Sequence, residues 1–172
     1  MNNFPNPPLD NIAGIASFNF VEVEKVNSIP FVINNKITSS IVLKDGYLWF
    51  KGYSSIDSLE YSEPIKQSNH GNFIEAELKG FVPESPEILQ LFTKMDGRRF
   101  ILHLTDNDNL KKIAGTIEQP LTFLCNFETQ TVSGNKGYKY HFKGLLTKRA
   151  PIYTAADPTT MPDDNPQESS SI

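Results

Sequence analysis

The chain has 172 residues, of which 38% are hydrophobic and 21% are charged. This composition is ordinary for a soluble globular protein, and it excludes the collagen-like, coiled-coil and wholly disordered classes. No apolar stretch approaches the roughly 18 residues of a spanning helix, and the start lacks the pattern of a signal peptide. We therefore expect no membrane partner. The single cysteine, Cys125, excludes an intrachain disulfide.

The charges are distributed unevenly along the chain. It carries 16 Lys and Arg against 20 Asp and Glu, a formal net charge of -4. Residues 154–172 contain four acidic residues and no Lys or Arg, so they account for the whole net charge and residues 1–153 are neutral. A nucleic-acid-binding protein usually has an excess of basic residues. The charge balance therefore predicts no sequence-specific nucleic acid binding.

Composition divides the chain into three parts. Residues 1–16 form an N-terminal arm rich in Asn and Pro, residues 17–153 a β-rich domain, and residues 154–172 an acidic, flexible C-terminal tail. Neither end can bury enough apolar surface to offset the entropy that ordering costs. We expect both arms to gain order against neighbouring subunits. Truncation after Tyr153 should then leave the melting temperature nearly unchanged.

The first predicted strand changes phase in its middle. Phe18 and Phe20 lie on one face, whereas Val21 and Val23 lie on the other. A side-chain period of two cannot place all four residues on a single face. The pattern predicts either a β-bulge or a strand that is covered on both faces.

Further strands follow in chain order. The apolar runs 37–43 and 47–53 flank Asp45-Gly46, and this dipeptide between apolar runs is typical of a β-hairpin. Alternating apolar residues then predict four more strands. These strands lie around residues 74–78, 100–104, 121–127 and 138–142.

One helix is predicted at about residues 86–96. Ser85 suits the N-cap, Pro86 the first helical position and Gly97 the position after the C-cap. One apolar stripe runs along it, formed by Ile88, Leu91, Phe92 and Met95. The chain is therefore expected to be mainly β, an antiparallel β-sandwich or barrel with one packed α-helix over an open edge or end and with extended N- and C-terminal arms.

Two loops resemble ligand sites only superficially. The acidic run 106–109 lacks the oxygen ligand and the glycine of a calcium loop, because Leu110 and Lys111 occupy those places. The run 134–137 has two glycines and a lysine, but a strand follows it instead of the helix that a phosphate loop opens. Both runs are predicted to be hairpin turns.

The remaining candidates offer no enzyme constellation. Cys125 lies on an inward strand face, where burial raises the pKa of a thiol and makes it unreactive. Glu75 and Glu77 share the polar face of a strand and are expected to be solvated. The histidines lack the spacing of a zinc site, and they are His70, His103 and His141. We predict no catalytic, cofactor-binding or metal-binding residues.

The most basic stretch is Lys148-Arg149. It is either a solvated strand end or a docking site for an acidic segment. The obvious acidic segment is the tail of a neighbouring copy, with Asp157, Asp163 and Asp164. In the second interpretation these five residues form a charge-complementary contact between subunits.

Three stretches carry a family resemblance: Gly80-Phe81-Val82-Pro83-Glu84-Ser85-Pro86-Glu87 continuing through the helix to Arg98-Arg99-Phe100, then Ala114-Gly115-Thr116-Ile117-Glu118-Gln119-Pro120-Leu121, then Gly137-Tyr138-Lys139-Tyr140-His141-Phe142-Lys143-Gly144 with Lys148-Arg149-Ala150-Pro151. Together they resemble a group of small structural proteins encoded in phages and prophages of Bacteroidetes hosts. The similarity covers roughly residues 74–153, and most of its motifs are turn, cap and strand signals.

The resemblance implies a non-enzymatic virion protein that forms a ring or tube layer of the tail or of the head–tail connector. It implies a homo-oligomer that contacts other virion proteins, with possible passage of DNA through a lumen, and assembly in the host cytoplasm into the virion. It implies no cofactor and no catalytic residue.

Two other classes stay open. One is a small-ligand-binding β-barrel whose cavity is lined by aromatic rows, formed by Phe123, Tyr138, Tyr140 and Phe142. The other is a hydrolase, which would need a cleft with clustered titratable groups.

Overall fold

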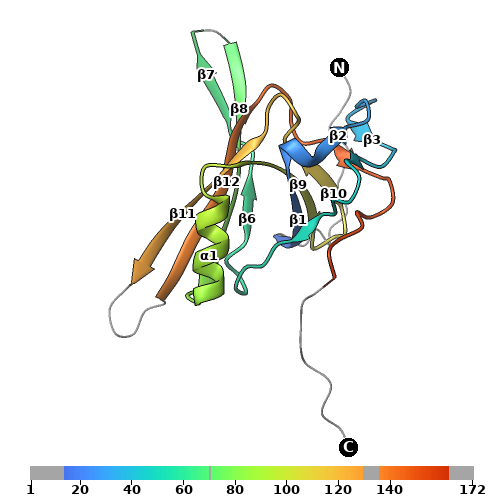
Figure 1. The fold of residues 1–172 in the computed structure, drawn as a ribbon. Helices are drawn as coiled ribbons and strands as arrows, with labels where there is room; N and C mark the ends of the chain where they lie inside the picture. Colours follow the sequence, from blue (N-terminus) through green and yellow to red (C-terminus); the bar gives the residue numbers. More distant parts are fainter. Residues whose placement is uncertain (1–13, 70, 130–135, 163–172) are drawn as a thin grey trace, which may run out of the picture.

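The computed structural model describes residues 14–69, 71–129 and 136–162 (Figure 1). The described chain is mainly β with one α-helix, as the sequence predicts. Its strands are β1 (Ile15–Glu22), β2 (Val26–Ser28), β3 (Lys36–Ile37), β4 (Val42–Leu43), β5 (Phe50–Lys51), β6 (Glu60–Ser62), β7 (Ile65–Ser68), β8 (Gly71–Pro83), β9 (Arg99–Asp106), β10 (Lys111–Ala114), β11 (Leu121–Thr129), β12 (Lys136–Leu146) and β13 (Ile152–Tyr153). The helices are the short 3-10 turn η1 (Val23–Lys25) and α1 (Pro86–Met95).

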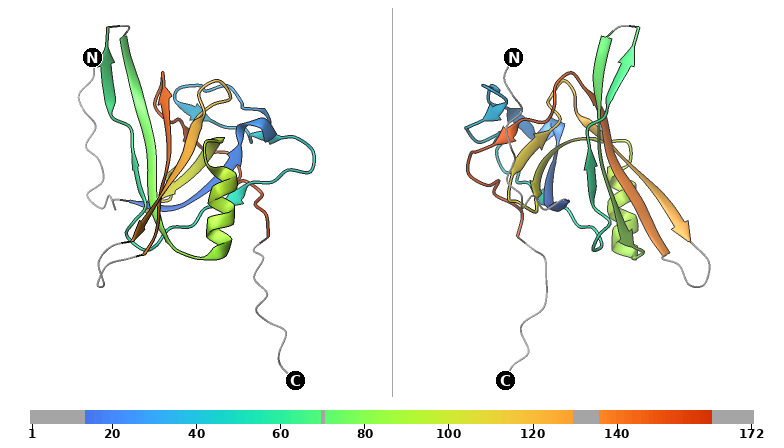
Figure 2. Two further views of the ribbon diagram at one scale, coloured as in Figure 1. Left: turned by 60° about the vertical axis from the view of Figure 1, so that its left-hand side comes forward. Right: turned by 180° about the vertical axis from the view of Figure 1, so that it is seen from behind.

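The main sheet is mostly antiparallel and folds into two layers. Its order is β3-β13-β10-β9-β11-β12-β8-β6, with β1 paired to β9 and β5, and β7 paired to β8. β11 pairs with β12 along its length but with β9 only through Leu121 and Thr122, so the sheet bends there. The two layers face each other as in a sandwich (Figure 2). No strand pairing among the described residues closes them into a barrel.

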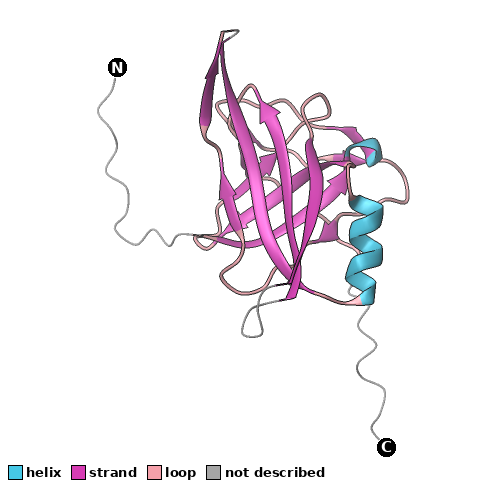
Figure 3. Ribbon diagram, turned by 90° about the vertical axis from the view of Figure 1, so that its left-hand side faces the viewer, coloured by secondary structure: helices cyan, strands magenta, loops and turns pink. Residues whose placement is uncertain are grey.

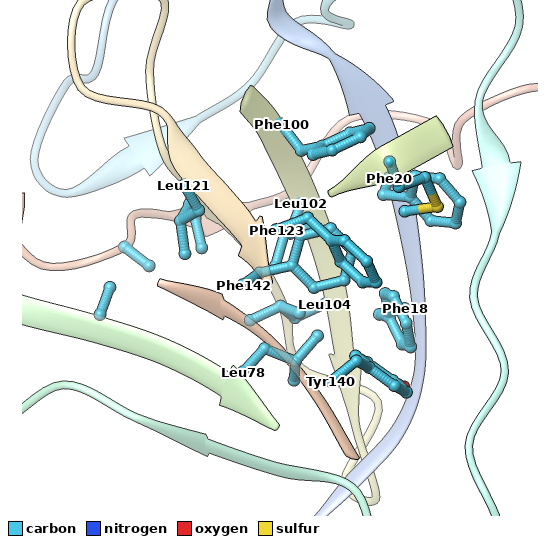
Figure 4. Packing of buried hydrophobic residues seen from close by; sticks show 14 of the residues in the cluster. Phe18, Phe20, Leu78, Phe100, Leu102, Leu104, Leu121, Phe123, Tyr140 and Phe142 are labelled. Atoms are coloured by element: carbon cyan, nitrogen blue, oxygen red, sulfur yellow. The ribbon is translucent and has the colours of Figure 1, made fainter. Parts of the chain in front are cut away.

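Two cores lie on opposite faces of β1 and β9. The first core lies between the layers and is rich in aromatic rings (Figure 4), and it includes Phe18, Phe20, Leu78, Phe100, Leu102, Leu104, Leu121, Phe123, Tyr140 and Phe142. The second core lies outside β9 and contains Val21, Val23, Val26, Ile37, Ile41, Trp49, Ile101, Ile113 and Tyr153. The phase change in the first strand therefore reflects a strand covered on both faces.

The helix α1 has the predicted caps. The Ser85 Oγ accepts a hydrogen bond from the Ile88 amide at 3.2 Å, and Gly97 has a φ of 72° just beyond the helix. Phe92 and Met95 are buried in the first core, so the helix packs by one face over the open side between the layers. No helix of the described residues has the length and apolar character that crossing a membrane requires.

The predicted hairpin at Asp45-Gly46 is wrong. A turn does form there, with the Tyr47 amide donating to the Lys44 carbonyl at 3.2 Å. The flanking strands separate, however, because β4 pairs with β2 and β5 pairs with β1. Of the two central residues only Gly46 has a positive φ, whereas a type I′ hairpin turn requires positive φ at both.

Residues 52–59 connect the two layers on the side opposite the β9–β11 bend. The Gly52 amide donates to the Phe18 carbonyl of β1 at 2.8 Å, and the Ser55 amide donates to the Phe81 carbonyl of β8 at 2.8 Å. Only glycine fits at position 52, because an added Cβ would lie 2.0 Å from the Phe18 ring. One stretch of chain thus holds the β1 and β8 edges together.

The folded body extends past the boundary that we expected at Tyr153. The Trp49 amide donates to the Thr159 carbonyl at 3.2 Å, and the Met161 amide donates to the Trp49 carbonyl at 2.8 Å. Residues 154–161 therefore cover the second core rather than forming part of a free tail, because their backbone groups find partners far away in the sequence. At the other end β1 already begins at Ile15. Residues 1–13 and 163–172 lie outside the described part of the chain.

Truncation after Tyr153 should consequently lower the melting temperature, contrary to the expectation from composition. It removes the hydrogen bonds to Trp49 and uncovers part of the second core. Thermal unfolding of this variant, compared with a truncation after Pro162 that keeps those bonds, measures the effect. Equal melting temperatures for the two truncations would show that residues 154–161 do not stabilise the fold.

Substitution of Phe92 by Ala should cost about 3–5 kcal/mol of unfolding free energy. The Phe92 ring lies 5.0, 5.7 and 5.6 Å from the ring centroids of Phe123, Tyr138 and Tyr140. Urea unfolding measures the loss, and Leu89→Ala on the exposed face of α1 serves as the control. A loss below about 1 kcal/mol for Phe92→Ala would contradict this packing.

Candidate functional site

The predicted docking residues Lys148 and Arg149 are exposed on the segment between β12 and β13. The Arg149 Nη1 lies 3.7 Å from the Glu63 Oε2, and the Glu63 side chain is only 9% exposed. The other Glu63 oxygen accepts from the Ala150 amide at 2.7 Å and from the Tyr61 hydroxyl at 2.8 Å. Burial, with repulsion from Glu63, raises the pKa of Tyr61 far above its ordinary value. Glu63 thus anchors this segment and leaves both cations facing solvent.

The acidic partners predicted for these cations lie elsewhere or outside the described residues. The Asp157 Oδ1 is 2.5 Å from the Lys111 Nζ of the same chain. Asp163 and Asp164 are outside the part of the chain that the structure describes. The structure therefore gives Asp157, the described member of the three predicted acids, a partner within its own chain rather than Lys148.

A tight turn at Asn34-Asn35 leads from Ile33 into β3. The Ile33 and Lys36 backbones exchange two hydrogen bonds, of 3.0 and 2.9 Å. Asn34 and Asn35 between them have φ values of 50° and 60°. This is the pattern of a type I′ turn, and asparagine tolerates its left-handed backbone better than most residues do.

The residues before this turn are apolar and exposed. Phe31 is 93%, Ile33 66% and Val32 48% exposed. Val32 also lines a small cavity of about 120 Å³ together with Lys148 and Arg149, so the loop and the basic pair adjoin. We call this combined face the anchor surface, and it comprises Phe31, Val32, Ile33, Lys36, Lys148 and Arg149. Contiguous exposed apolar residues of this kind mark interaction sites.

An open hollow of about 570 Å³ lies between the start of β1 and residues 52–59. Its apolar wall is formed chiefly by Ile15, Phe18 and Leu59, and Ile56 adds a further apolar side chain to the lining. Among the described residues, Asp57 is the one charged residue of that lining, and no described histidine is part of it. The hollow can receive apolar groups, but its lining offers no acid–base pair for catalysis.

His103 is buried on the second-core face of β9, with 2% of its surface exposed. Its Nδ1 lies 3.4 Å from the side-chain amide nitrogen of Asn19, and its Nε2 has no hydrogen-bond partner among the residues that the structure describes. The rings of Trp49 and Tyr153 stand edge-on at 6.4 and 5.2 Å. Burial lowers the pKa of His103, partly offset by Asp157. The imidazole is therefore held neutral inside the protein, away from the hollow.

The other histidines do not assemble a metal site. The His141 Nδ1 lies 3.0 Å from the Glu77 Oε1 on the outer face of the sheet. His70 lies outside the described residues. In the described ranges no three His, Cys, Asp or Glu side chains come together as a metal site requires.

The carboxylates expected to be solvated are in ion pairs. The Lys143 Nζ lies 2.8 Å from the Glu75 Oε1, and the Lys79 Nζ lies 3.5 Å from the Glu77 Oε2. The hydrogen bond between Lys143 and Glu75 lowers the pKa of the carboxyl and raises that of the lysine. The Lys143–Glu75 pair joins β12 to β8, a stabilising cross-strand arrangement, whereas Lys79 and Glu77 lie two residues apart on β8 itself.

The loop and thiol candidates have structural roles. The Asp106 Oδ1 accepts from the Asp108 amide at 3.0 Å and the Leu110 amide at 2.7 Å, which confirms a hairpin turn between β9 and β10. Burial, with a smaller effect of Asp96, raises the pKa of the Cys125 thiol, so the thiol is poorly reactive. Of the predicted turn at 134–137, only residues 136 and 137 are described, and they lie in β12.

The aromatic rows line no cavity of ligand size among the described residues. The ring centroids of Phe123 and Phe142 are 4.9 Å apart, and those of Tyr140 and Phe142 are 6.1 Å apart. The cavity beside them has a volume of only about 80 Å³. This volume is far below the range of about 300–1,000 Å³ of ligand sites. The rows expected to surround a ligand form the first core instead.

The sequence did not reveal the exposed loop or the hollow. The pair Asn34-Asn35 after an apolar run indicates a turn, but this pattern does not tell whether the apolar side chains before the turn are buried. The hollow is formed by segments that are distant in the sequence. Comparison with known proteins finds no family model, no curated protein and no solved structure that matches this chain.

His103 should make stability depend on pH. Burial lowers its folded-state pKa below the value of about 6.5 in unfolded chains, so its contribution is present above pH ~6.5 and is lost as the pH falls below it. Urea unfolding between pH 5 and pH 7.5 gives the unfolding free energy at each pH. This free energy should change less with pH in His103→Gln than in the wild type. His141→Gln, at the half-exposed histidine, is the control. An unchanged pH dependence in His103→Gln would contradict this assignment.

Proposed function

We propose that this chain is a non-enzymatic structural protein of a phage virion that assembles into a ring or tube layer of the tail or head–tail connector. The resemblance over roughly residues 74–153 supports this function, and so does a sandwich with one covering helix. The observation that carries the proposal is a sheet layer with two open edges.

One open edge belongs to β11. The Phe123 amide donates to the Arg98 carbonyl and the Phe123 carbonyl accepts from the Gly97 amide, both at 2.9 Å, on the side away from β12. Backbone groups alternate in direction along an antiparallel strand. Those of Cys125 and Phe127 therefore point to the same side, where no strand of the described chain pairs with them.

The other open edge belongs to β6 and β7. Each of these short strands pairs with β8, and no further strand of the described residues adds to them. The layer β11-β12-β8-β6/β7 therefore offers different edges on its two sides (Figure 3). Open edges are templates for pairing with another chain. A contact between two different edges repeats from copy to copy and closes into a ring when the rotation allows.

The charge distribution supports the same proposal. Residues 1–153 are neutral overall, and ion pairs within β8 and between β8 and β12 balance charges on the outer sheet face. A wall without basic excess would let DNA slide past, because it would release few counterions. We accordingly place the protein in the virion, in contact with copies of itself and with other virion proteins.

The second candidate is a small-ligand-binding protein. The hollow of about 570 Å³ favours it, since this volume falls within the range of ligand sites. The packed aromatic rows disfavour the barrel cavity in which we expected the ligand. A ligand in the hollow would raise the melting temperature of the monomer without changing its oligomeric state.

The oligomeric state tests the proposal. Gel filtration with light scattering should give a ring-sized species, and electron micrographs of virions should contain the protein. A chain that stays monomeric at high concentration and is missing from particles would overturn it.

Phe127→Pro should raise the protein concentration that assembly requires by at least about tenfold. Proline removes an amide donor from the open edge of β11 but none from its ladder with β12, so the monomer should keep its melting temperature to within a few degrees. Phe127→Leu keeps both the amide and an apolar side chain and is the control. Normal assembly of the proline variant would exclude pairing at this edge.

A further inference from the structure

We propose that the anchor surface of one copy inserts into the hollow of the next copy, head to tail. This inference rests on the proposed self-assembly and assigns it a second contact. β2 and β3 lie in the upper part of the folded body in Figures 1 and 2, below the tip of β7 and β8, whereas the start of β1 and residues 52–59 lie lower down. One copy cannot place its own loop in its own hollow. The contact is therefore between copies, and it stacks them.

The loop is prepared for such a contact. Phe31 is 93% exposed, which is, together with Ile56, the largest exposed fraction among the large apolar side chains that the structure describes. The paired hydrogen bonds between Ile33 and Lys36 fix the turn that directly follows Phe31 and Val32. Large aromatic side chains on rigid supports are typical binding hot spots, because little conformational entropy is lost on binding.

The hollow has the size and the walls to receive the loop. Its volume of about 570 Å³ is that of a ligand site, enough for the few side chains at a loop tip. Ile15, Phe18 and Leu59 offer an apolar wall, and Ile56 also contributes to the lining. Burial of Phe31 there would remove exposed apolar surface from both copies.

The charges of the two ends are complementary. The anchor surface carries Lys36, Lys148 and Arg149, and the 3.7 Å contact of Arg149 with Glu63 leaves most guanidinium donors available. The hollow has Asp57 as its charged lining residue, and Asn107 in its lining is flanked by two aspartates of the β9–β10 turn. Opposite charges at a contact fix its orientation and speed its formation. Acids of the hollow thus replace the tail acids predicted from the sequence.

A cross-linking experiment tests the geometry. In a Cys125→Ser background, Phe31→Cys combined with Ile56→Cys should form a ladder of disulfide-linked oligomers under mild oxidation. Either cysteine alone should form no ladder. Dimers from Phe31→Cys alone would indicate a two-fold contact between loops and would overturn the head-to-tail arrangement. Absence of cross-links in the double variant would overturn it as well.

A pair of charge variants tests complementarity. Lys148→Glu combined with Arg149→Glu should raise the protein concentration that stacking requires by at least about tenfold. Asp57→Lys added to that variant should restore part of the loss, because the two introduced glutamates then face a lysine instead of an aspartate. No loss in the first variant would exclude these cations from the contact.

An assembly experiment separates this inference from the proposed function. Phe31→Asp should abolish stacked rings in micrographs while single rings persist, whereas Phe127→Pro should abolish the rings. Leu89→Asp, at an exposed apolar residue on α1, is the matched control and should assemble like the wild type. If Phe31→Asp forms stacked rings as the wild type does, the loop contact is excluded, whereas the proposed virion function is unaffected. A wild type without rings would overturn the function itself.

Discussion

The structure depends on one strand that is buried on both faces. Side chains of β9 alternate between two cores, with Leu102 and Leu104 between the sheet layers and Ile101 on the opposite side. Because alternation in a strand is fixed by the backbone, an apolar strand of this kind requires a cover on each side. The second layer and α1 provide one cover. Residues 23–49 and 154–161 provide the other, and so segments without long strands become part of the folded body.

Elements that are specified locally could be predicted from the sequence. The caps of α1 act within a few residues, and the alternating rows of β8, β9 and β12 need only their own pattern to be recognised. The local signal at Asp45-Gly46 predicted a hairpin that does not form, because β4 pairs with β2 and β5 pairs with β1 instead of with each other. The extent of the C-terminal tail depended on hydrogen bonds to Trp49, more than a hundred residues earlier in the chain.

The candidate site shows the same division. The sequence marked Lys148 and Arg149 as basic, and the structure places them beside the exposed apolar loop. The sequence could not indicate that Asp157 would pair with Lys111 or that distant segments would enclose a hollow. Surface sites of this kind arise from tertiary neighbours. Their individual residues carry no pattern that distinguishes them from ordinary loops and strand ends.

The order of the chain has a consequence for how the protein is made. The ribosome synthesises residues 154–161 after every strand that they cover. While these residues are still in the exit tunnel, Trp49 of the second core lacks its last cover. The nascent protein completes this side only after residues 154–161 have left the tunnel. A chaperone that binds exposed apolar surface has its opportunity before that moment.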